Sequence, residues 1–115
     1  MTPEEIVRAE LHAWEHADID EILSYLAPDA VWHMLELPPI SGHDELRSAL
    51  EGYLARGRPT EFEVLRLAVG DNLVMTERVD RWVIGGRPQD YPGMSAFDIT
   101  GDKISLVREI FPRPE

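Results

Sequence analysis

Residues 73–84 read Leu-Val-Met-Thr-Glu-Arg-Val-Asp-Arg-Trp-Val-Ile, and apolar and polar side chains alternate along much of this stretch. Alternation is typical of a β-strand, and it places Arg78 and Asp80 together on one face. On the inner face of a sheet these charges would lie among apolar side chains, where each needs a partner because an unpaired buried charge is costly. On the outer face they would form an exposed cross-strand salt bridge. The spacing leaves both positions open.

The same period of two continues on either side of this stretch, in segments separated by short turn sequences that contain glycine. The turns are Gly70-Asp71-Asn72, Gly85-Gly86-Arg87-Pro88 and Gly101-Asp102. Such turns join antiparallel neighbours, so the second half of the chain predicts a four-stranded antiparallel meander. Its strands are expected at residues 60–69, 73–84, 89–100 and 103–111.

The first half of the chain carries apolar residues at helical spacing instead. Thr2-Pro3-Glu4-Glu5 matches a capping box with proline at the first helical position, and Asp18 begins a second capped segment. An apolar run over residues 30–35 has the length of a strand, and the prolines and glycine of residues 37–42 indicate a loop. Helices are therefore expected over residues 3–17, from residue 19 to the stop at Pro28-Asp29, and over residues 43–56.

These elements predict one domain over residues 1–115, of the α+β class, with three N-terminal helices packed in a strongly curved, mixed but mostly antiparallel sheet. A sheet curved in this way forms a cone that encloses a pocket. Apolar residues on both faces of the strands also require cover on the side away from the helices. We therefore expect a homodimer through the outer face, with Met75, Val79 and Val83 in the interface.

The composition limits the classes of function. The 115 residues contain no cysteine, so a disulfide framework, a thiolate metal site and a cysteine nucleophile are excluded. Acidic residues outnumber basic ones 22 to 11, and the formal net charge of −11 disfavours nucleic acid and anionic membrane surfaces as partners. The acidic first residues do not resemble a signal peptide, and no apolar run reaches membrane-spanning length, so we expect a cytoplasmic protein.

The last predicted strand offers a partner for the charged pair. Glu109 shares a face with Val107 and Phe111, so a carboxylate again interrupts an apolar row. An arginine between two carboxylates can hold one of them ionised as a base, while the other keeps its proton as an acid in a drier position. Arg78, Asp80 and Glu109 are therefore the candidate catalytic residues.

Three stretches of the sequence resemble the limonene-1,2-epoxide hydrolases, a family of the NTF2-like (SnoaL-like) superfamily. They are residues 77–80 (Glu-Arg-Val-Asp), residues 101–111 and residues 37–42 (Leu-Pro-Pro-Ile-Ser-Gly). The resemblance implies the NTF2-like cone and a one-step opening of an epoxide that needs no cofactor. By position it implies that Asp80 protonates the epoxide oxygen, that Glu109 activates the attacking water, and that Arg78 bridges the two carboxyl groups.

The sequence departs from that family at two places. Glu109 stands where the family has aspartate, which keeps the charge and moves the carboxylate by one methylene. The family also holds its water with a tyrosine and an asparagine two residues apart, and these positions are Trp32 and Met34 here. An indole only donates hydrogen bonds, and a thioether accepts them weakly. His33 between them is expected on the opposite face, toward solvent or a subunit partner.

The expected pocket includes one further carboxylate, Glu10, which falls in the middle of the apolar sector of the first helix. It either lines the pocket or extends past the rim of the sheet. No metal site is expected, because His12 and His16 lack the HExxH order and suit a solvated helix face. The residues expected to line the substrate pocket are Glu10, Trp14, Trp32, Met34, Trp82 and Phe111.

Three functions remain open. The first is a cofactor-free hydrolase that opens a small hydrophobic epoxide through Arg78, Asp80 and Glu109. The second is a non-catalytic pocket protein that binds a hydrophobic small molecule, which the apolar character of Trp32 and Met34 favours. The third is an isomerase resembling the ketosteroid isomerases of the same superfamily. That reaction needs a carboxylate base on the first strand, where Trp32 and Met34 stand.

Overall fold

A single mixed sheet of six strands forms the frame of the molecule, with its strands in the order β2-β1-β6-β5-β4-β3. All neighbouring strands run antiparallel except β1 and β6, which are parallel. The computed structural model describes residues 1–112, so residues 113–115 of the predicted domain lie outside the described part. The strands are β1 (Leu26–Met34), β2 (Ile40–Ser41), β3 (Gly57–Gly70), β4 (Leu73–Ile84), β5 (Arg87–Thr100) and β6 (Lys103–Ile110).

Three helices complete the α+β fold, and the local sequence explains where two of them begin. The side chains of Thr2 and Glu5 each accept a hydrogen bond from the other's backbone N–H, so the predicted capping box is present. The Asp18 side chain caps the second helix by accepting from the backbone N–H of Glu21. The helices are α1 (Pro3–Glu15), α2 (Ile19–Ser24) and α3 (His43–Arg56). None of the helices in residues 1–112 is long and apolar enough to span a membrane.

The predicted α+β class is confirmed, but three details of the prediction are wrong. The first helix ends at Glu15, because Ala17 takes a left-handed backbone conformation with φ of 55°. The second helix stops at Ser24, and Leu26 already begins β1. Moreover, the short β2 inside the predicted loop adds a sixth strand. Of the three helices, α1 and α2 precede β1, and α3 follows β1 and β2.

The predicted meander is confirmed, since β3, β4, β5 and β6 pair in succession. Gly85 and Gly86 connect β4 to β5 with φ angles of 59° and 76°, a conformation that glycine adopts without strain. The register matters for the site, because Thr76 of β4 lies opposite Ser95 of β5, and Ser95 lies opposite Glu109 of β6. Three adjacent strands therefore bring a row of polar side chains to one face of the sheet.

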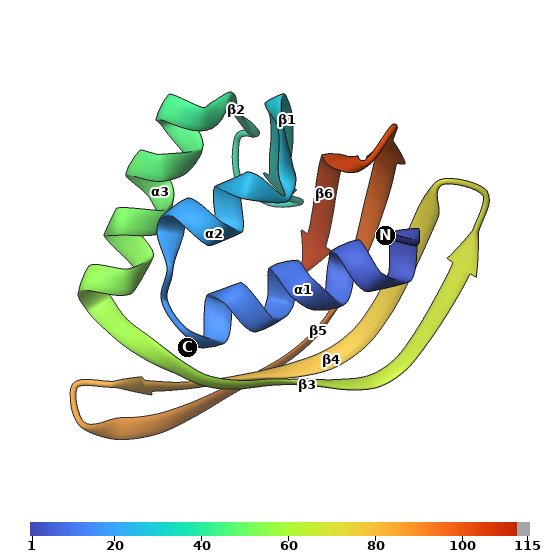
Figure 1. Cartoon of the computed structure of the whole chain (residues 1–115). Coiled ribbons are helices and arrows are strands. Elements are labelled where there is room, and N and C mark those ends of the chain that lie inside the picture. The colour runs from blue at the N-terminus through green and yellow to red at the C-terminus, as the bar shows by residue number, and fades with distance from the viewer. Residues whose placement is uncertain (113–115) are drawn as a thin grey trace.

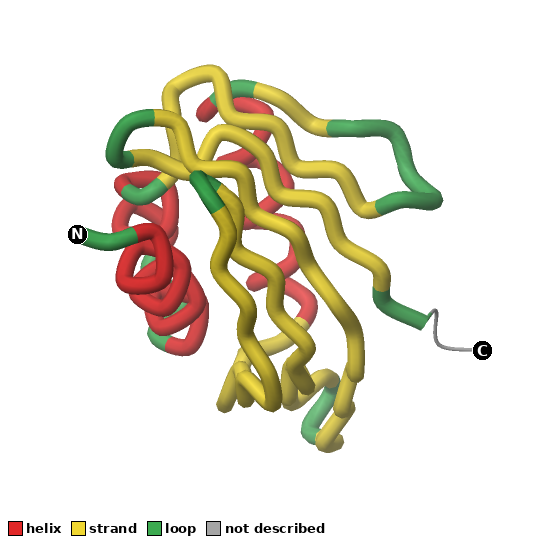
Figure 2. The backbone as a smooth tube through the Cα atoms, turned by 90° about the vertical axis from the view of Figure 1, so that its right-hand side faces the viewer, coloured by secondary structure: helices red, strands yellow, loops and turns green. Residues whose placement is uncertain are grey.

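The sheet curves around the helices, and the long strands β3, β4 and β5 pass beneath α1 (Figure 1). Figure 2 shows the helices gathered on one face of the sheet. On this concave face α1 buries Ile6, Val7 and Leu11 in the hydrophobic core. Arg78 and Asp80 are only 2% and 7% exposed. The exposed salt bridge that the sequence left open is therefore excluded, and the charged pair lies inside the molecule.

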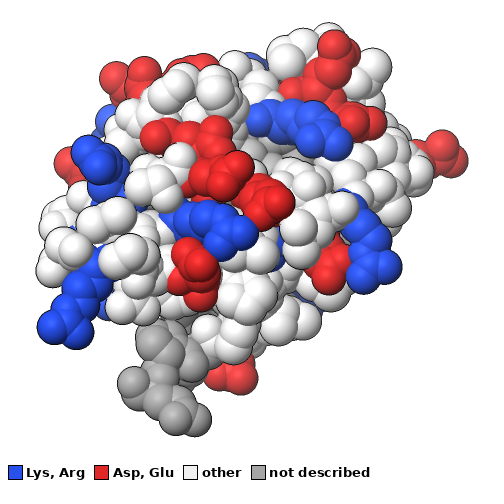
Figure 3. Space-filling view, turned by 90° about the horizontal axis from the view of Figure 1, so that it is seen from below, with Lys and Arg blue, Asp and Glu red and all other residues white. Residues whose placement is uncertain are grey.

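The convex face of the sheet, away from the helices, exposes several large apolar side chains. Met75 and Met94 are 44% and 52% exposed. Val79 and Val83 alternate with the buried residues of β4 and are partly exposed. Charged side chains of both signs are interspersed with uncharged surface on the underside of the molecule (Figure 3). Apolar groups left in water in this number favour a partner that covers them.

We expect this convex face to form a homodimer, because a second copy of the chain would bury the same apolar side chains from both partners. Sedimentation equilibrium at micromolar concentration should give the mass of two chains. Met75→Lys places a charge in the apolar area and should shift the equilibrium toward the monomer. A wild-type protein that sediments as a monomer under these conditions contradicts the prediction.

Candidate active site

A cavity of about 470 Å³ opens between the helices and the concave face of the sheet. It receives side chains from α1, α3 and all of the long strands. The sequence predicted three catalytic and six pocket residues, and every one of them lines this cavity. These residues are Glu10, Trp14, Trp32, Met34, Arg78, Asp80, Trp82, Glu109 and Phe111. Side chains from far apart in the chain therefore meet in one place.

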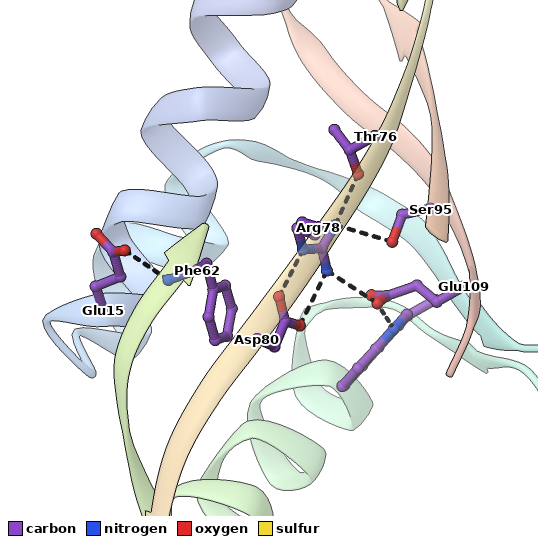
Figure 4. A network of polar contacts seen from close by, with 8 residues as sticks. Glu15, Phe62, Thr76, Arg78, Asp80, Ser95 and Glu109 are labelled. Atoms are coloured by element: carbon purple, nitrogen blue, oxygen red, sulfur yellow. Dashed lines mark hydrogen bonds and ion pairs between the residues drawn. The ribbon is translucent and has the colours of Figure 1, made fainter. Parts of the chain in front are cut away.

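Arg78 lies at the centre of the polar cluster, and all five of its N–H groups have an acceptor (Figure 4). Its Nε and Nη2 contact the two carboxylate oxygens of Asp80 at 2.8 and 3.3 Å. Nη2 also donates to Oε2 of Glu109 at 3.2 Å. Nη1 donates to the hydroxyl groups of Thr76 and Ser95 at 3.0 and 2.9 Å. The guanidinium group is thus held in one orientation between two carboxylates.

Aromatic rings surround the same guanidinium group. The centroids of Phe62, Phe97 and Phe111 lie 5.7, 5.9 and 5.4 Å from the central carbon of Arg78, within the range of cation–π contacts. Gly93 lies opposite Arg78 on β5, and a Cβ atom at this position would collide with the ring of Phe111. The glycine therefore leaves room for the ring that covers the arginine.

Burial changes the acid–base properties of the cluster. It raises the pKa of Asp80 to about 6, although the contacts with Arg78 act in the opposite direction. Burial by itself lowers the pKa of Arg78, yet the charges of Glu109 and Asp80 outweigh it and raise the pKa above its ordinary value. The arginine therefore stays charged, while the proton of Asp80 is available close to neutral pH.

Glu10 lies inside the cavity and does not reach the rim of the sheet, because it is only 4% exposed. Burial raises the pKa of Glu10 to about 8, and the negative charges of Glu109 and Asp80 add to this rise. The charge of Arg78 and a hydrogen bond from Trp14 lower the pKa of Glu10, but by a smaller amount. Glu10 therefore carries its proton at neutral pH and brings no further negative charge to the cluster.

Trp32 and Met34 of β1, where the sequence departs from the resembled family, each take part in a hydrogen bond. The indole Nε1 of Trp32 donates to Oε1 of Glu109 at 2.9 Å. The hydroxyl group of Tyr53 donates to the sulfur of Met34 at 3.3 Å. His33 lies opposite Arg108 on the other face of the sheet, as the alternation predicted.

Aromatic side chains make up much of the remaining wall of the cavity. All three tryptophans, two of the three tyrosines and two of the three phenylalanines of the chain line it. Trp14 is the centre of this cluster, with ring centroids 5.9 Å from Trp32, 5.8 Å from Phe62 and 6.1 Å from Trp82. The cavity thus combines one polar patch with a broad apolar surface.

Sequence reasoning missed three residues that complete the site. Thr76 shares the inner face of β4 with Arg78, so alternation already placed it near the arginine. Ser95 and Gly93 lie on β5, and their roles depend on the register between strands. A register cannot be read from one strand, because a shift by one residue turns every side chain to the other face. Only the three-dimensional pairing of the strands identifies Ser95 and Gly93.

The sequence profile of the SnoaL-like domain matches residues 7–107. The chain belongs to the SnoaL-like family. Among solved structures, this SnoaL-like chain is similar to an LEH-like epoxide hydrolase from M. tuberculosis, at 24% identity and a TM-score of 0.85 over 96% of this chain and 82% of the other. It is also similar to a candidate polyketide cyclase from Xanthomonas campestris pv. campestris, at 21% identity and a TM-score of 0.87 over 96% and 90% of the two chains.

A third structure widens the range of activities named on this fold. A candidate isomerase from Bacillus subtilis has 15% identity to the SnoaL-like chain and a TM-score of 0.85, with 97% of this chain and 90% of the other covered. At these identities the likeness establishes the NTF2-like fold alone. One fold supports several chemistries, so the function of this chain must be argued from its own cavity.

We expect Arg78→Ala to reduce the free energy of unfolding by about 3–5 kcal/mol, because it leaves two buried carboxyl groups without their shared cation. Asp80→Asn and Glu109→Gln should cost less, since each leaves the arginine with one carboxylate. Arg81→Ala is the matched control, because Arg81 lies on the same strand and contacts three carboxylates at the surface. Urea unfolding of the four variants measures the differences. An Arg78→Ala loss no larger than that of Arg81→Ala contradicts the prediction.

We expect Glu10→Gln to become more stable than the wild type as the pH rises. The pKa of Glu10 is about 8 in the folded protein, against an ordinary value of 4.5. Between these pH values the folded state holds a proton on Glu10 that the unfolded chain has released, so the wild type loses stability as the pH rises. The Glu10→Gln variant has no such proton and does not lose stability in this way. Thermal melts from about pH 5 to about pH 8 measure the change. Glu4→Gln, on the same helix but outside the cavity, is the matched control.

Proposed function

We propose that this protein is a cofactor-free hydrolase that opens a small, apolar epoxide by adding water. One observation carries the proposal: a buried arginine joins two carboxyl groups from different strands at the wall of a 470 Å³ cavity. Burying three ionisable groups is costly, and strongly perturbed groups in a cleft are typical of catalytic sites. The similarity to an LEH-like epoxide hydrolase agrees with this proposal.

The proposed reaction has one step. Glu109 takes a proton from water, the water oxygen forms a bond to one epoxide carbon, and the bond from that carbon to the epoxide oxygen breaks. Asp80 gives its proton to the departing oxygen, so the product is a neutral diol. Glu109 then holds a proton and Asp80 lacks one, and exchange with solvent restores both groups. The reaction involves no oxidation or reduction, and water is its only reactant besides the epoxide.

The surroundings of the two carboxyl groups support this division of roles. Burial raises the pKa of Asp80 to about 6, which makes its proton available near neutral pH. Both oxygens of Glu109 accept hydrogen bonds, one from the Trp32 indole and one from Arg78. These two donors orient the Glu109 carboxylate within the site. Arg78 compensates for the negative charge of whichever group is ionised at each stage.

The wall of the cavity supports an apolar substrate. Aromatic rings such as Trp14, Trp82 and Tyr91 occupy much of it, and they bind ligands through contact area with few hydrogen bonds. A volume of about 470 Å³ lies within the range of small-molecule sites. We therefore infer a substrate with a hydrocarbon ring or chain next to a single epoxide group.

A second candidate is a protein that binds an apolar molecule and does not change it. Trp32 and Met34 favour this alternative, because they take the positions where the resembled family holds its water. The related isomerase function has less support. The side chains that β1 adds to the cavity are Trp32 and Met34, and neither supplies the carboxylate base that this reaction needs.

We expect Asp80→Asn to abolish epoxide hydrolysis while the fold stays intact, because an amide cannot deliver a proton to the departing oxygen. Diol formation from cyclohexene oxide and longer cyclic epoxides, followed by gas chromatography, measures the loss. Circular dichroism of the variant checks the fold. Unchanged turnover would remove Asp80 from the mechanism.

The same assay separates the two candidate functions. If neither protein forms diol while an apolar ligand still raises the melting temperature of the wild type, the binding function is the better description. If the wild type forms diol and Asp80→Asn does not, the hydrolase is supported.

A further inference from the structure

A second, much smaller cavity lies beside the main one, and four residues border both. Its volume is about 20 Å³. The residues common to the two cavities are Glu10, Trp14, Trp32 and Glu109. The rest of its wall is made of apolar side chains from α2, α3, β1 and β6. These are Ile22, Leu26, Ala30, Val31, Leu46, Leu50 and Val107.

The size and lining of the small cavity suit one water molecule. A cavity needs about 10–15 Å³ of this kind of space to hold a water, so about 20 Å³ admits one. A buried water also needs two to four polar partners. The carboxyl groups of Glu10 and Glu109, one from α1 and one from β6, both line the cavity and supply these partners. The indole N–H groups of Trp14 and Trp32 donate to Glu10 and Glu109, and the remaining side chains around the cavity are apolar.

We propose that Glu10 and Glu109 together bind one water molecule at the boundary between the two cavities, and that this water attacks the substrate. The inference rests on the hydrolase function proposed above. It assigns to Glu10 a task that the resembled family gives to side chains of its first strand. Here the helix α1 supplies the water-holding group that Trp32 and Met34 of β1 do not.

Hydrogen-bond geometry explains why two carboxyl groups are enough. A water molecule has two protons and two lone pairs. When one proton is donated to Glu109 and the other to the carbonyl oxygen of Glu10, both lone pairs remain free to point toward the main cavity. Trp32 cannot compete for this water as a donor, because its indole N–H is already bound to Oε1 of Glu109. The water is thus oriented for attack before the substrate arrives, which lowers the entropic part of the barrier.

The charge state of Glu10 decides which carboxyl group acts as the base. The charged groups that act on Glu10 are Arg78 and Asp80 of β4 and Glu109 of β6. With its pKa raised to about 8, Glu10 is protonated at neutral pH and accepts a hydrogen bond without removing a proton. Glu109 is therefore the group that deprotonates the water. A neutral Glu10 also avoids a third negative charge beside a single arginine.

The test compares two replacements of Glu10 by steady-state kinetics on a cyclic epoxide. Glu10→Leu removes the hydrogen-bonding group and should lower kcat about 100-fold with little change in KM, because the water is misplaced but the epoxide still binds. Glu10→Gln keeps a carbonyl oxygen at the same place and should recover at least about tenfold of that loss. Glu4→Gln is the matched control on the same helix and should behave as the wild type. Glu10→Met replaces the leucine variant if that variant does not fold.

A crystal structure of the wild type without ligand tests the water site independently of turnover. We expect one ordered water within hydrogen-bond distance of both Glu10 and Glu109, and no water there in Glu10→Leu. Full kcat in Glu10→Leu, or a wild-type structure with no water between the two carboxyl groups, overturns the proposal. A wild type that hydrolyses no epoxide contradicts the hydrolase function and with it the attack by this water, and the crystal structure then decides separately whether the water site exists.

Discussion

The rest of the site depends on the hydrogen bonds that occupy all five N–H groups of the Arg78 guanidinium. A buried arginine is tolerated only when its charge and its N–H groups are all compensated, and here five donors find Asp80, Glu109, Thr76 and Ser95. These partners come from β4, β5 and β6, so the contacts form only when three strands pair in the correct register. The site therefore forms only when these strands pair in the correct register. A shift of β5 by one residue would remove Ser95 from the arginine.

The balance of charge around this arginine explains why the cavity holds protons close to neutral pH. One positive charge faces three carboxyl groups, Asp80, Glu109 and Glu10, in a space that water reaches poorly. Full ionisation of all three would leave a net charge of about −2 in a medium where repulsion is strong. Burial and mutual repulsion therefore raise the pKa of Glu10 to about 8 and that of Asp80 to about 6. Groups that titrate in this range can exchange protons with a substrate.

Much of the fold and most of the site could be predicted from the sequence, because both follow from short-range periodicity. Alternation placed Arg78 and Asp80 on one face, and the capping residues located the starts of α1 and α2. The features that could not be predicted from the sequence depend on contacts between segments that are distant in the chain. The pairing of β2 with β1, the role of Ser95, and the room that Gly93 leaves for a ring over the arginine all require the tertiary arrangement. The position of Glu10 could not be decided from the helix alone, since the depth of the cavity beneath α1 is set by the curvature of the sheet.

That curvature also determines which elements contribute to the site. The concave face is bordered by a helix and by several strands, so α1 brings Glu10 to the same cavity that receives Trp32 from β1. Trp32 donates its indole N–H directly to Glu109, and this hydrogen bond orders the carboxylate that we propose as the base. Trp14 and Trp32 border both the small cavity and the main one. Besides these two indoles, the polar side chains shared by the two cavities are Glu10 and Glu109, so the water site that we propose depends on a helix and a strand that the curved sheet brings together.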